Sequence, residues 1–120
     1  MRPVSGAIIG FAALVHFCIP AQARPPTEDG FRRLNAGQIR QALVGREFSD
    51  DVHFRYQYQA DGKIIGQGMG QKVSDRWRIA DQQLCMISRG RESCYFVWKK
   101  GKAIRLLIED SDISIDGQIR

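Results

Sequence analysis

The sequence predicts an α+β fold that is mainly β: a short N-terminal helix followed by a six- or seven-strand antiparallel meander, closed or half-closed into a barrel. Three observations predict it. A full helix signature occurs at 34–45, apolar and polar residues alternate between Gly-containing turns in the chain that follows, and two cysteines flank one of these turns symmetrically. The length of 120 residues fits one small domain. We place this domain at 34–120, after a flexible lead-in at 24–33.

Residues 1–23 have the pattern of an export signal. Arg2 provides a positive start, an apolar run of 16 residues extends over 4–19, and the small residues Ala21 and Ala23 follow it. The run is shorter than the roughly 20 residues that a membrane-spanning helix needs. We therefore expect this segment to be removed during export, which leaves no membrane span.

The helix signature begins with Asn35 as the N-cap, and Gln38 three residues later completes a capping box. Leu34 and Ile39 are spaced to form a hydrophobic staple across the helix start. Gly45 suits the left-handed residue that follows a helix. A helix this short is marginal alone, so we expect it to dock on the sheet.

Alternation of apolar and polar residues predicts the strands. The first is 53–59, and Asp61-Gly62 after it is a strong signal for a two-residue hairpin loop. That loop would place the aromatic residues of this strand opposite Ile65, Gln67 and Met69, and the glycines of the next strand on the other face. Later strands are expected around the following ranges, the last of which would add an edge strand: 72–79, 84–88, 93–99, 102–108 and 110–118.

Three alternate glycines, Gly66, Gly68 and Gly70, superficially match a phosphate-binding loop. Such loops need a helix directly after the glycines, and here the strand pattern continues. We interpret the glycines as a stripe without side chains that lets a neighbouring group pack closely.

Cleavage after Ala23 also removes Cys18 and leaves an even pair, Cys85 and Cys94, which in an exported chain predicts a disulfide. A two-residue turn at Arg89-Gly90 makes the numbers of facing residues sum to 179, which is the sum of the two cysteines. The pair is then of the non-hydrogen-bonded type, with Cα atoms about 4.5 Å apart, a distance that a disulfide bridges.

Beyond the export signal the chain has one histidine, His53, which excludes sites that need two, such as HExxH zinc proteases. No GxSxG motif occurs, oxidised cysteines provide no thiolate, and 109–116 lacks the glycine that a calcium loop needs at its sixth position. We therefore expect no catalytic residues, no metal and no cofactor. One alternative stays open, a minimal hydrolase or nuclease that uses His53 with Asp50, Asp51 or nearby arginines.

Basic residues outnumber acidic ones 18 to 13, and loss of Arg2 with the signal leaves a net charge of 17 − 13 = +4. Arg76 and Arg78 flank Trp77, and Trp98 follows in a later strand, so these four are the candidate partner-binding residues. The pattern is similar to platforms that stack nucleic-acid bases. We interpret most of this charge as ordinary solvated surface. The alternative is a partner, which for an exported protein would be an anionic envelope component or an acidic protein, and not nucleic acid.

Alternate aromatic residues have two interpretations. They line a calyx around a small apolar ligand, or they fill the interior of a small barrel, and we favour the second. The residues concerned are Phe54, Tyr56, Tyr58, Trp77, Phe96 and Trp98.

The run DGKIIGQGMG…RWRIADQQLC…SCYFVW resembles small exported bacterial β domains of unknown function with a single disulfide. In those domains a D-G hairpin precedes a G-x-W strand, and the next hairpin carries one cysteine in each strand; this chain departs in having Asp75 in place of the glycine. More loosely, it is similar to periplasmic lysozyme inhibitors, which are disulfide-bearing β-barrels, but it lacks their inhibitory loop motif of Ser-Gly and a Tyr. The resemblance implies a fold class and a location, and no functional residues.

We therefore expect an exported module, periplasmic or secreted, that is non-enzymatic and acts by binding or inhibiting a partner that the sequence does not identify. The alternative in a different class is a lipocalin-like carrier of a small ligand.

Overall fold

In a computed structural model of the chain, the described residues are 3, 6, 10, 12–14 and 26–120. The expected export signal at 1–23 therefore lies almost wholly outside the described residues and stays a prediction. In the described part, no helix has the length and apolar character needed to cross a membrane.

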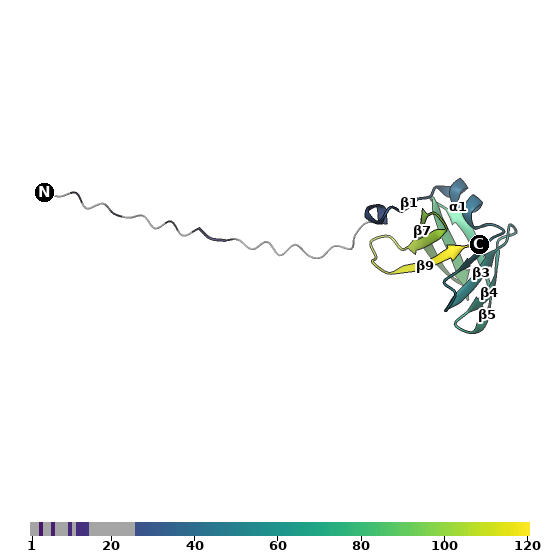
Figure 1. The fold of residues 1–120 in the computed structure, drawn as a ribbon. Helices are drawn as coiled ribbons and strands as arrows, with labels where there is room; N and C mark the ends of the chain where they lie inside the picture. The colour runs from purple at the N-terminus through teal and green to yellow at the C-terminus, as the bar shows by residue number, and fades with distance from the viewer. Residues whose placement is uncertain (1–2, 4–5, 7–9, 11, 15–25) are drawn as a thin grey trace.

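Nine strands of the described chain form one sheet, and eight of them, β2 to β9, close into an antiparallel barrel (Figure 1). Each of the eight pairs with its neighbours in the chain, and β9 returns to pair with β2. β1 pairs with β7 and lies outside the closed ring. The strands are β1 (Arg32–Arg33), β2 (Glu47–Ser49), β3 (Phe54–Tyr58), β4 (Lys63–Gly68), β5 (Gln71–Ala80), β6 (Gln83–Ser88), β7 (Arg91–Lys100), β8 (Ala103–Leu107) and β9 (Ser114–Ile119).

This architecture confirms the mainly β fold and the barrel, but the expected number of six or seven strands is wrong. The missed strands, β1 and β2, have two and three residues and are too short to show alternation. β9, expected as an edge strand, instead closes the barrel through the pair Phe48 and Ile119. Within the expected lead-in at 24–33, the structure places a 3-10 turn at Pro26–Asp29 and then β1.

The helix α1 (Ala36–Leu43) covers part of one end of the barrel, which we call the α1 end (Figure 1). The predicted capping box is confirmed: the Gln38 amide donates to Asn35 Oδ1 at 2.9 Å, and the Asn35 amide donates to Gln38 Oε1 at 2.9 Å. Gly45 has the left-handed φ of 75° expected after the helix. The buried side chains of the helix dock it on the barrel: Ile39, Ala42 and Leu43.

The β3–β4 hairpin has a three-residue loop, so its predicted register is wrong by one residue. The Gln59 amide donates to the Lys63 carbonyl oxygen at 2.8 Å, which closes a loop at 60–62 instead of a two-residue turn. Tyr56 consequently faces Gly66. The aromatic residues of β3 and the glycines of β4 therefore share the inner face of the barrel.

The glycines of β4 leave space for the backbone of Arg55 and for the ring of Tyr56. Gly66 has φ of 149°, and a Cβ there would overlap the carbonyl oxygen of Arg55. A Cβ at Gly68 would lie 2.9 Å from the hydroxyl of Tyr56. The interpretation of these glycines as a stripe for close packing is confirmed at both positions, on the aromatic face of the hairpin and not on the opposite one.

The half of the barrel next to α1 is filled by side chains. Tyr58 and Trp77 meet edge to face with ring centroids 6.3 Å apart, and the Trp77 indole donates to the Gln59 carbonyl at 2.8 Å. The preference for a filled interior over a calyx is therefore confirmed for Tyr58 and Trp77, but Phe96 and Trp98 flank the buried Val97 and lie on the outer face of β7. The buried residues of this half are Phe48, Tyr58, Ile64, Trp77, Leu84, Val97, Ile104, Leu106 and Ile119.

Cys85 and Cys94 form the predicted disulfide across the β6–β7 hairpin. The two residues are direct cross-strand partners, as the turn at Arg89-Gly90 requires, and their Cα atoms lie 4.0 Å apart. The turn and the cysteine spacing therefore predicted one and the same hairpin register.

Candidate anion-binding cleft

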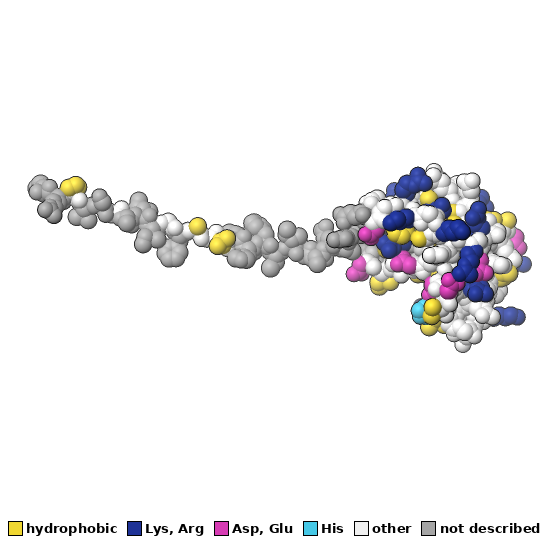
Figure 2. Space-filling view, in the orientation of Figure 1, with side chains coloured by type: hydrophobic (Ala, Val, Ile, Leu, Met, Phe, Trp, Pro, Cys, Tyr) yellow, Lys and Arg dark blue, Asp and Glu magenta, His cyan; other side chains and the backbone are white. Residues whose placement is uncertain are grey.

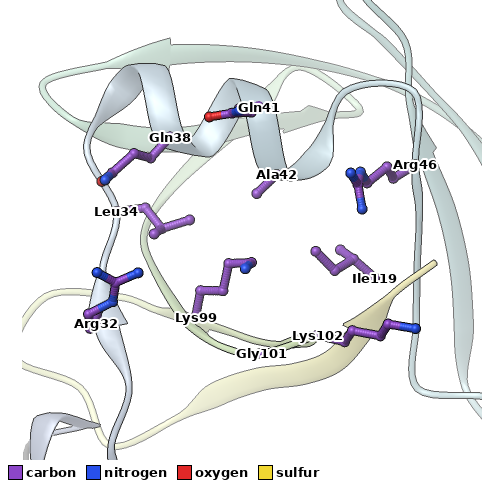
Figure 3. Close-up of a pocket in the computed structure, with 10 residues that line it drawn as sticks. All are labelled: Arg32, Leu34, Gln38, Gln41, Ala42, Arg46, Lys99, Gly101, Lys102 and Ile119. Carbon is purple, nitrogen blue, oxygen red and sulfur yellow. The ribbon is translucent and has the colours of Figure 1, made fainter.

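Because α1 covers only part of its end of the barrel, the uncovered part forms a cleft of about 370 Å³. An eight-residue helix is only about 12 Å long, and α1 lies against β6. The cleft opens between α1 and the turn from β7 to β8, with β1 on one side and the end of β9 on the other (Figure 3). It is lined by Arg32, Leu34, Gln38, Gln41, Ala42, Arg46, Lys99, Gly101, Lys102 and Ile119.

The floor of the cleft is apolar. Leu34, Ala42 and Ile119 line it, and each is more than nine-tenths buried. The Leu34 amide donates to the Val97 carbonyl at 2.8 Å, which holds the segment after β1 against β7. A ligand in the cleft would therefore contact hydrocarbon as well as polar groups.

Four basic side chains surround this floor: Arg32 of β1, Arg46 after α1, Lys99 of β7 and Lys102 of the β7–β8 turn. Arg32 and Lys99 are direct cross-strand partners. Lys99 lies on the inner face of β7, because its partner on β8 is the buried Ile104. Its side chain extends into the middle of the cleft (Figure 3).

None of these four cations has a carboxylate partner among the described side chains. The ten residues that line the cleft include no acidic residue, and Figure 2 shows Lys and Arg side chains gathered around the α1 end. The cleft therefore carries positive charge that the described protein does not compensate. Five basic residues elsewhere in the described chain are ion-paired, although others, such as Lys72 and Arg76, are not: Arg55 with Glu47, Lys63 with Asp61, Arg78 with Glu92, Arg105 with Asp29 and Asp116, and Arg120 with Asp51.

The helix adds two amide side chains to the cleft, Gln38 and Gln41. The capping box uses the Oε1 atom of Gln38, so its NH₂ group stays available as a donor. Gln41 is exposed. With donors and cations on its rim, the cleft can bind a group that carries several acceptor atoms and negative charge.

The four residues predicted to bind a partner do not form one surface. Trp77 is only 6% exposed and packs inside the barrel, so the expectation that it is exposed to a partner is wrong. Arg76 is exposed on the outer face of β5. Trp98 is half-buried on β7, facing Arg33 and Arg105 across the two neighbouring strands.

Arg78 shares the outer face of β5 but is engaged with Glu92. Its guanidinium donates two hydrogen bonds to this carboxylate, at 2.6 and 2.8 Å. These hydrogen bonds, together with the negative charge of Glu92, raise the pKa of Arg78 above its ordinary value. Arg78 would have to give up this ion pair to contact a partner.

His53 and Asp50, which the hydrolase alternative requires, are in contact: His53 Nδ1 lies 2.7 Å from Asp50 Oδ2. Desolvation alone would raise the pKa of Asp50, but its hydrogen bonds outweigh this and lower the pKa well below its ordinary value. Asp51 instead pairs with Arg120 at 2.7 Å. Asp50 therefore organises its loop, since its Oδ1 accepts from three backbone amides, those of Val52, His53 and Phe54.

One group of three side chains in the described chain has the spacing of metal ligands, Cys85, Glu92 and Cys94, with the ligand atoms within 4.8 Å of one another. Both sulfur atoms belong to the disulfide. Because metals bind the thiolate, this group does not fit a metal ion while the disulfide is intact.

Comparisons of the chain with protein-family models, with curated proteins and with solved structures return no match.

The cleft could not be predicted from the sequence, because its cations come from distant parts of the chain. Arg32 and Lys99 are 67 positions apart and meet only through β1, which is too short to predict. The one local signal is the basic turn 99–102, in which three of the four residues are lysines and none is acidic.

Proposed function

We propose that the protein is an exported, non-enzymatic binding module that holds an anionic group of an envelope component in the cleft at the α1 end. The observation that carries this proposal is a set of four cations around an apolar floor, for which the described residues provide no carboxylate partner. Hydrogen bonds between such cations and an anionic oxygen are among the strong ones. A bound anion would also relieve the repulsion between Arg32 and Lys99.

The floor narrows the chemistry of this anion. Leu34, Ala42 and Ile119 offer hydrocarbon directly beside the cations, and this combination suits a molecule with a phosphate and the start of an acyl chain. A purely polar anion would use the rim and leave the floor uncovered. The proposed ligand is therefore a lipid phosphate, and an acidic protein is the competing outcome of the test.

Two observations support export to the periplasm or the medium. Disulfides persist in oxidising compartments, and Cys85 is bridged to Cys94. The pattern at 1–23 is that of a removable signal. Mass spectrometry of protein isolated from its host should find a chain that begins at Arg24 with both cysteines bridged. Intact Met1 in the functional protein, or two free thiols in the exported form, would overturn this part.

Binding can be tested by calorimetry on the mature protein with dihexanoyl phosphatidic acid, a soluble lipid phosphate. We expect saturable binding that weakens with added salt, since screening reduces exposed charge interactions. Arg32→Gln and Lys99→Gln should each weaken binding about tenfold or more, the effect expected when a charged hydrogen bond is lost. Lys72→Gln is the matched control, because Lys72 is exposed on β5 and does not line the cleft.

Three results would overturn the proposal. The first is equal affinity for dihexanoyl phosphatidylcholine, whose headgroup has no net charge. The second is that Arg32→Gln and Lys99→Gln bind no more weakly than Lys72→Gln. The third is tighter binding of hexaglutamate than of the lipid in the same cleft, which would identify the acidic protein as the partner class.

A further inference from the structure

A second cavity, of about 270 Å³, lies inside the barrel toward the end opposite α1. Its residues come from five consecutive strands, β3 to β7, and lie on their inner faces. Asp75, for example, faces Ile64, which is 2% exposed, across the β4–β5 ladder. The lining residues are Tyr56, Ile64, Asp75, Met86, Ser88, Arg91, Ser93 and Tyr95.

This half of the interior is polar, unlike the half beside α1. Its wall includes one carboxylate, two serine hydroxyls and two phenol rings. The Asp75 carboxylate makes no hydrogen bond or ion pair with the described side chains. Asp75 is half-buried, so its carboxylate is available to a positively charged group that enters the cavity.

The aromatic walls suit a cation. Burial, together with the negative charge of Asp75, raises the pKa of Tyr56, so this phenol keeps its proton at neutral pH. Tyr56 and Tyr95 line the cavity, and aromatic rings and hydroxyl groups both attract a positive group. Gly68 preserves the space, since a Cβ there would lie 2.9 Å from the Tyr56 hydroxyl.

Arg91, the one basic residue of this wall, is exposed at the first position of β7, whereas Asp75 is half-buried. Of the two charged side chains that line the cavity, the more buried one is therefore the negative Asp75. Met86 and Ile64 supply apolar surface next to it. A ligand that enters from the open end would place a positive head group against Asp75 and its apolar body against these side chains.

We infer that this cavity is a second binding site, which takes a small organic ammonium ion with a compact apolar body and uses Asp75 as the counter-charge. One water-sized group occupies about 30 Å³ of liquid, so 270 Å³ accommodates a molecule of about nine such groups. 2-Phenylethylamine has this size and chemistry. The site shares no residue with the cleft at the α1 end and goes beyond the function proposed for that cleft.

Calorimetry and NMR on the mature protein can test the site with 2-phenylethylamine as the probe. Saturable binding at millimolar concentration or below should shift the Met86 methyl and the Tyr95 ring signals. Asp75→Asn, which keeps the shape of the side chain and removes its charge, should weaken binding about tenfold or more. Asp81→Asn is the matched control, because Asp81 is exposed in the β5–β6 turn and Asn tolerates its φ of 51°.

If Asp75→Asn does not fold, the site can still be tested on the native protein with two further probes. 3-Phenylpropionate and 2-phenylethanol carry the same ring with a negative or a neutral head, and both should bind at least about tenfold more weakly than the amine. Equal affinity for the three probes, no binding of the amine, or signal shifts confined to the outer face would overturn the inference. Lys99→Gln should leave amine binding unchanged, so failure here is distinguishable from failure of the anion-binding cleft.

Discussion

Arg32 and Lys99 stand directly opposite each other across the β1–β7 ladder, and no carboxylate among the described residues lies between them or beside them in the cleft. Like charges in this arrangement destabilise a sheet by about 0.2–1 kcal/mol. A local arrangement that opposes stability is expected where a protein binds something. The pair therefore links the stability of the fold to the occupancy of the cleft.

Lys99→Gln should raise the free energy of unfolding by about 0.2–1 kcal/mol at low salt, because it removes this repulsion. Urea denaturation of the mature protein measures the change. The gain should shrink at high salt, where charges are screened. Lys72→Gln makes the same change of net charge at an exposed position of β5. An equal gain in stability in both variants would show that the gain does not come from the repulsion between Arg32 and Lys99.

The Cys85–Cys94 disulfide should contribute to stability through the short loop that it closes. With a sequence separation of nine residues, the chain-entropy model gives about 2–3 kcal/mol. Thermal unfolding of the mature protein with and without a reducing agent measures this contribution. Identical midpoints, with reduction verified by alkylation of both thiols, would contradict it.

Gly66→Ala should be strongly destabilising. The backbone there has φ of 149°, and the added Cβ would overlap the Arg55 carbonyl oxygen. The strained backbone alone should cost about 1–3 kcal/mol, before any displacement of β3.

Gly37→Ala provides the contrast to Gly66→Ala, because Gly37 lies exposed in α1 and an added Cβ would meet only Asn35 Oδ1 at 3.7 Å. This variant should gain about 0.5–1 kcal/mol from helix propensity. Chemical denaturation of both variants checks the pair of values. Similar stability of the two would mean that the β3–β4 hairpin does not have the register described here.

Local signals in the sequence predicted the parts of the fold that depend on a few neighbouring residues. The capping box at Asn35 and Gln38 and the disulfide hairpin at Cys85 and Cys94 are confirmed because each follows from one turn or cap. The hairpin after β3 was off by one residue because a D-G pair fits both a two-residue and a three-residue loop. That single residue decides whether the glycines of β4 face inward or outward.

The candidate sites could not be predicted in the same way, because both depend on closure of the barrel. Trp77 was expected at the surface between two arginines, but alternation alone does not say which face of β5 is inside. Each of these pairings depends on a very short strand. β1, which brings Arg32 next to Lys99, has two residues, and β2, which pairs with β9, has three. Inner and outer faces, and the uncovered part of the α1 end, follow from these long-range pairings.

Asp50 should make stability depend on pH in acid. Its hydrogen bonds to the amides of Val52, His53 and Phe54 and to the His53 ring hold its pKa below the unfolded value of about 3.9. A lowered folded pKa means that its contribution is fully present above that value and is lost as pH falls toward the folded pKa.

Asp50→Ala should therefore lower the unfolding midpoint by several degrees at neutral pH, where all of these hydrogen bonds form to a charged carboxylate. The gap between native protein and Asp50→Ala should stay constant down to about pH 4 and then narrow, because below that pH the Asp50 carboxylate of the unfolded chain takes up a proton that the folded protein does not yet bind. Thermal unfolding between neutral pH and pH 2 follows the gap. Asp50→Asn keeps one acceptor oxygen and should lie between the two. If the gap instead widens in acid, the pKa of Asp50 is not lowered by folding, and the loop at 50–53 is not organised by a charged Asp50.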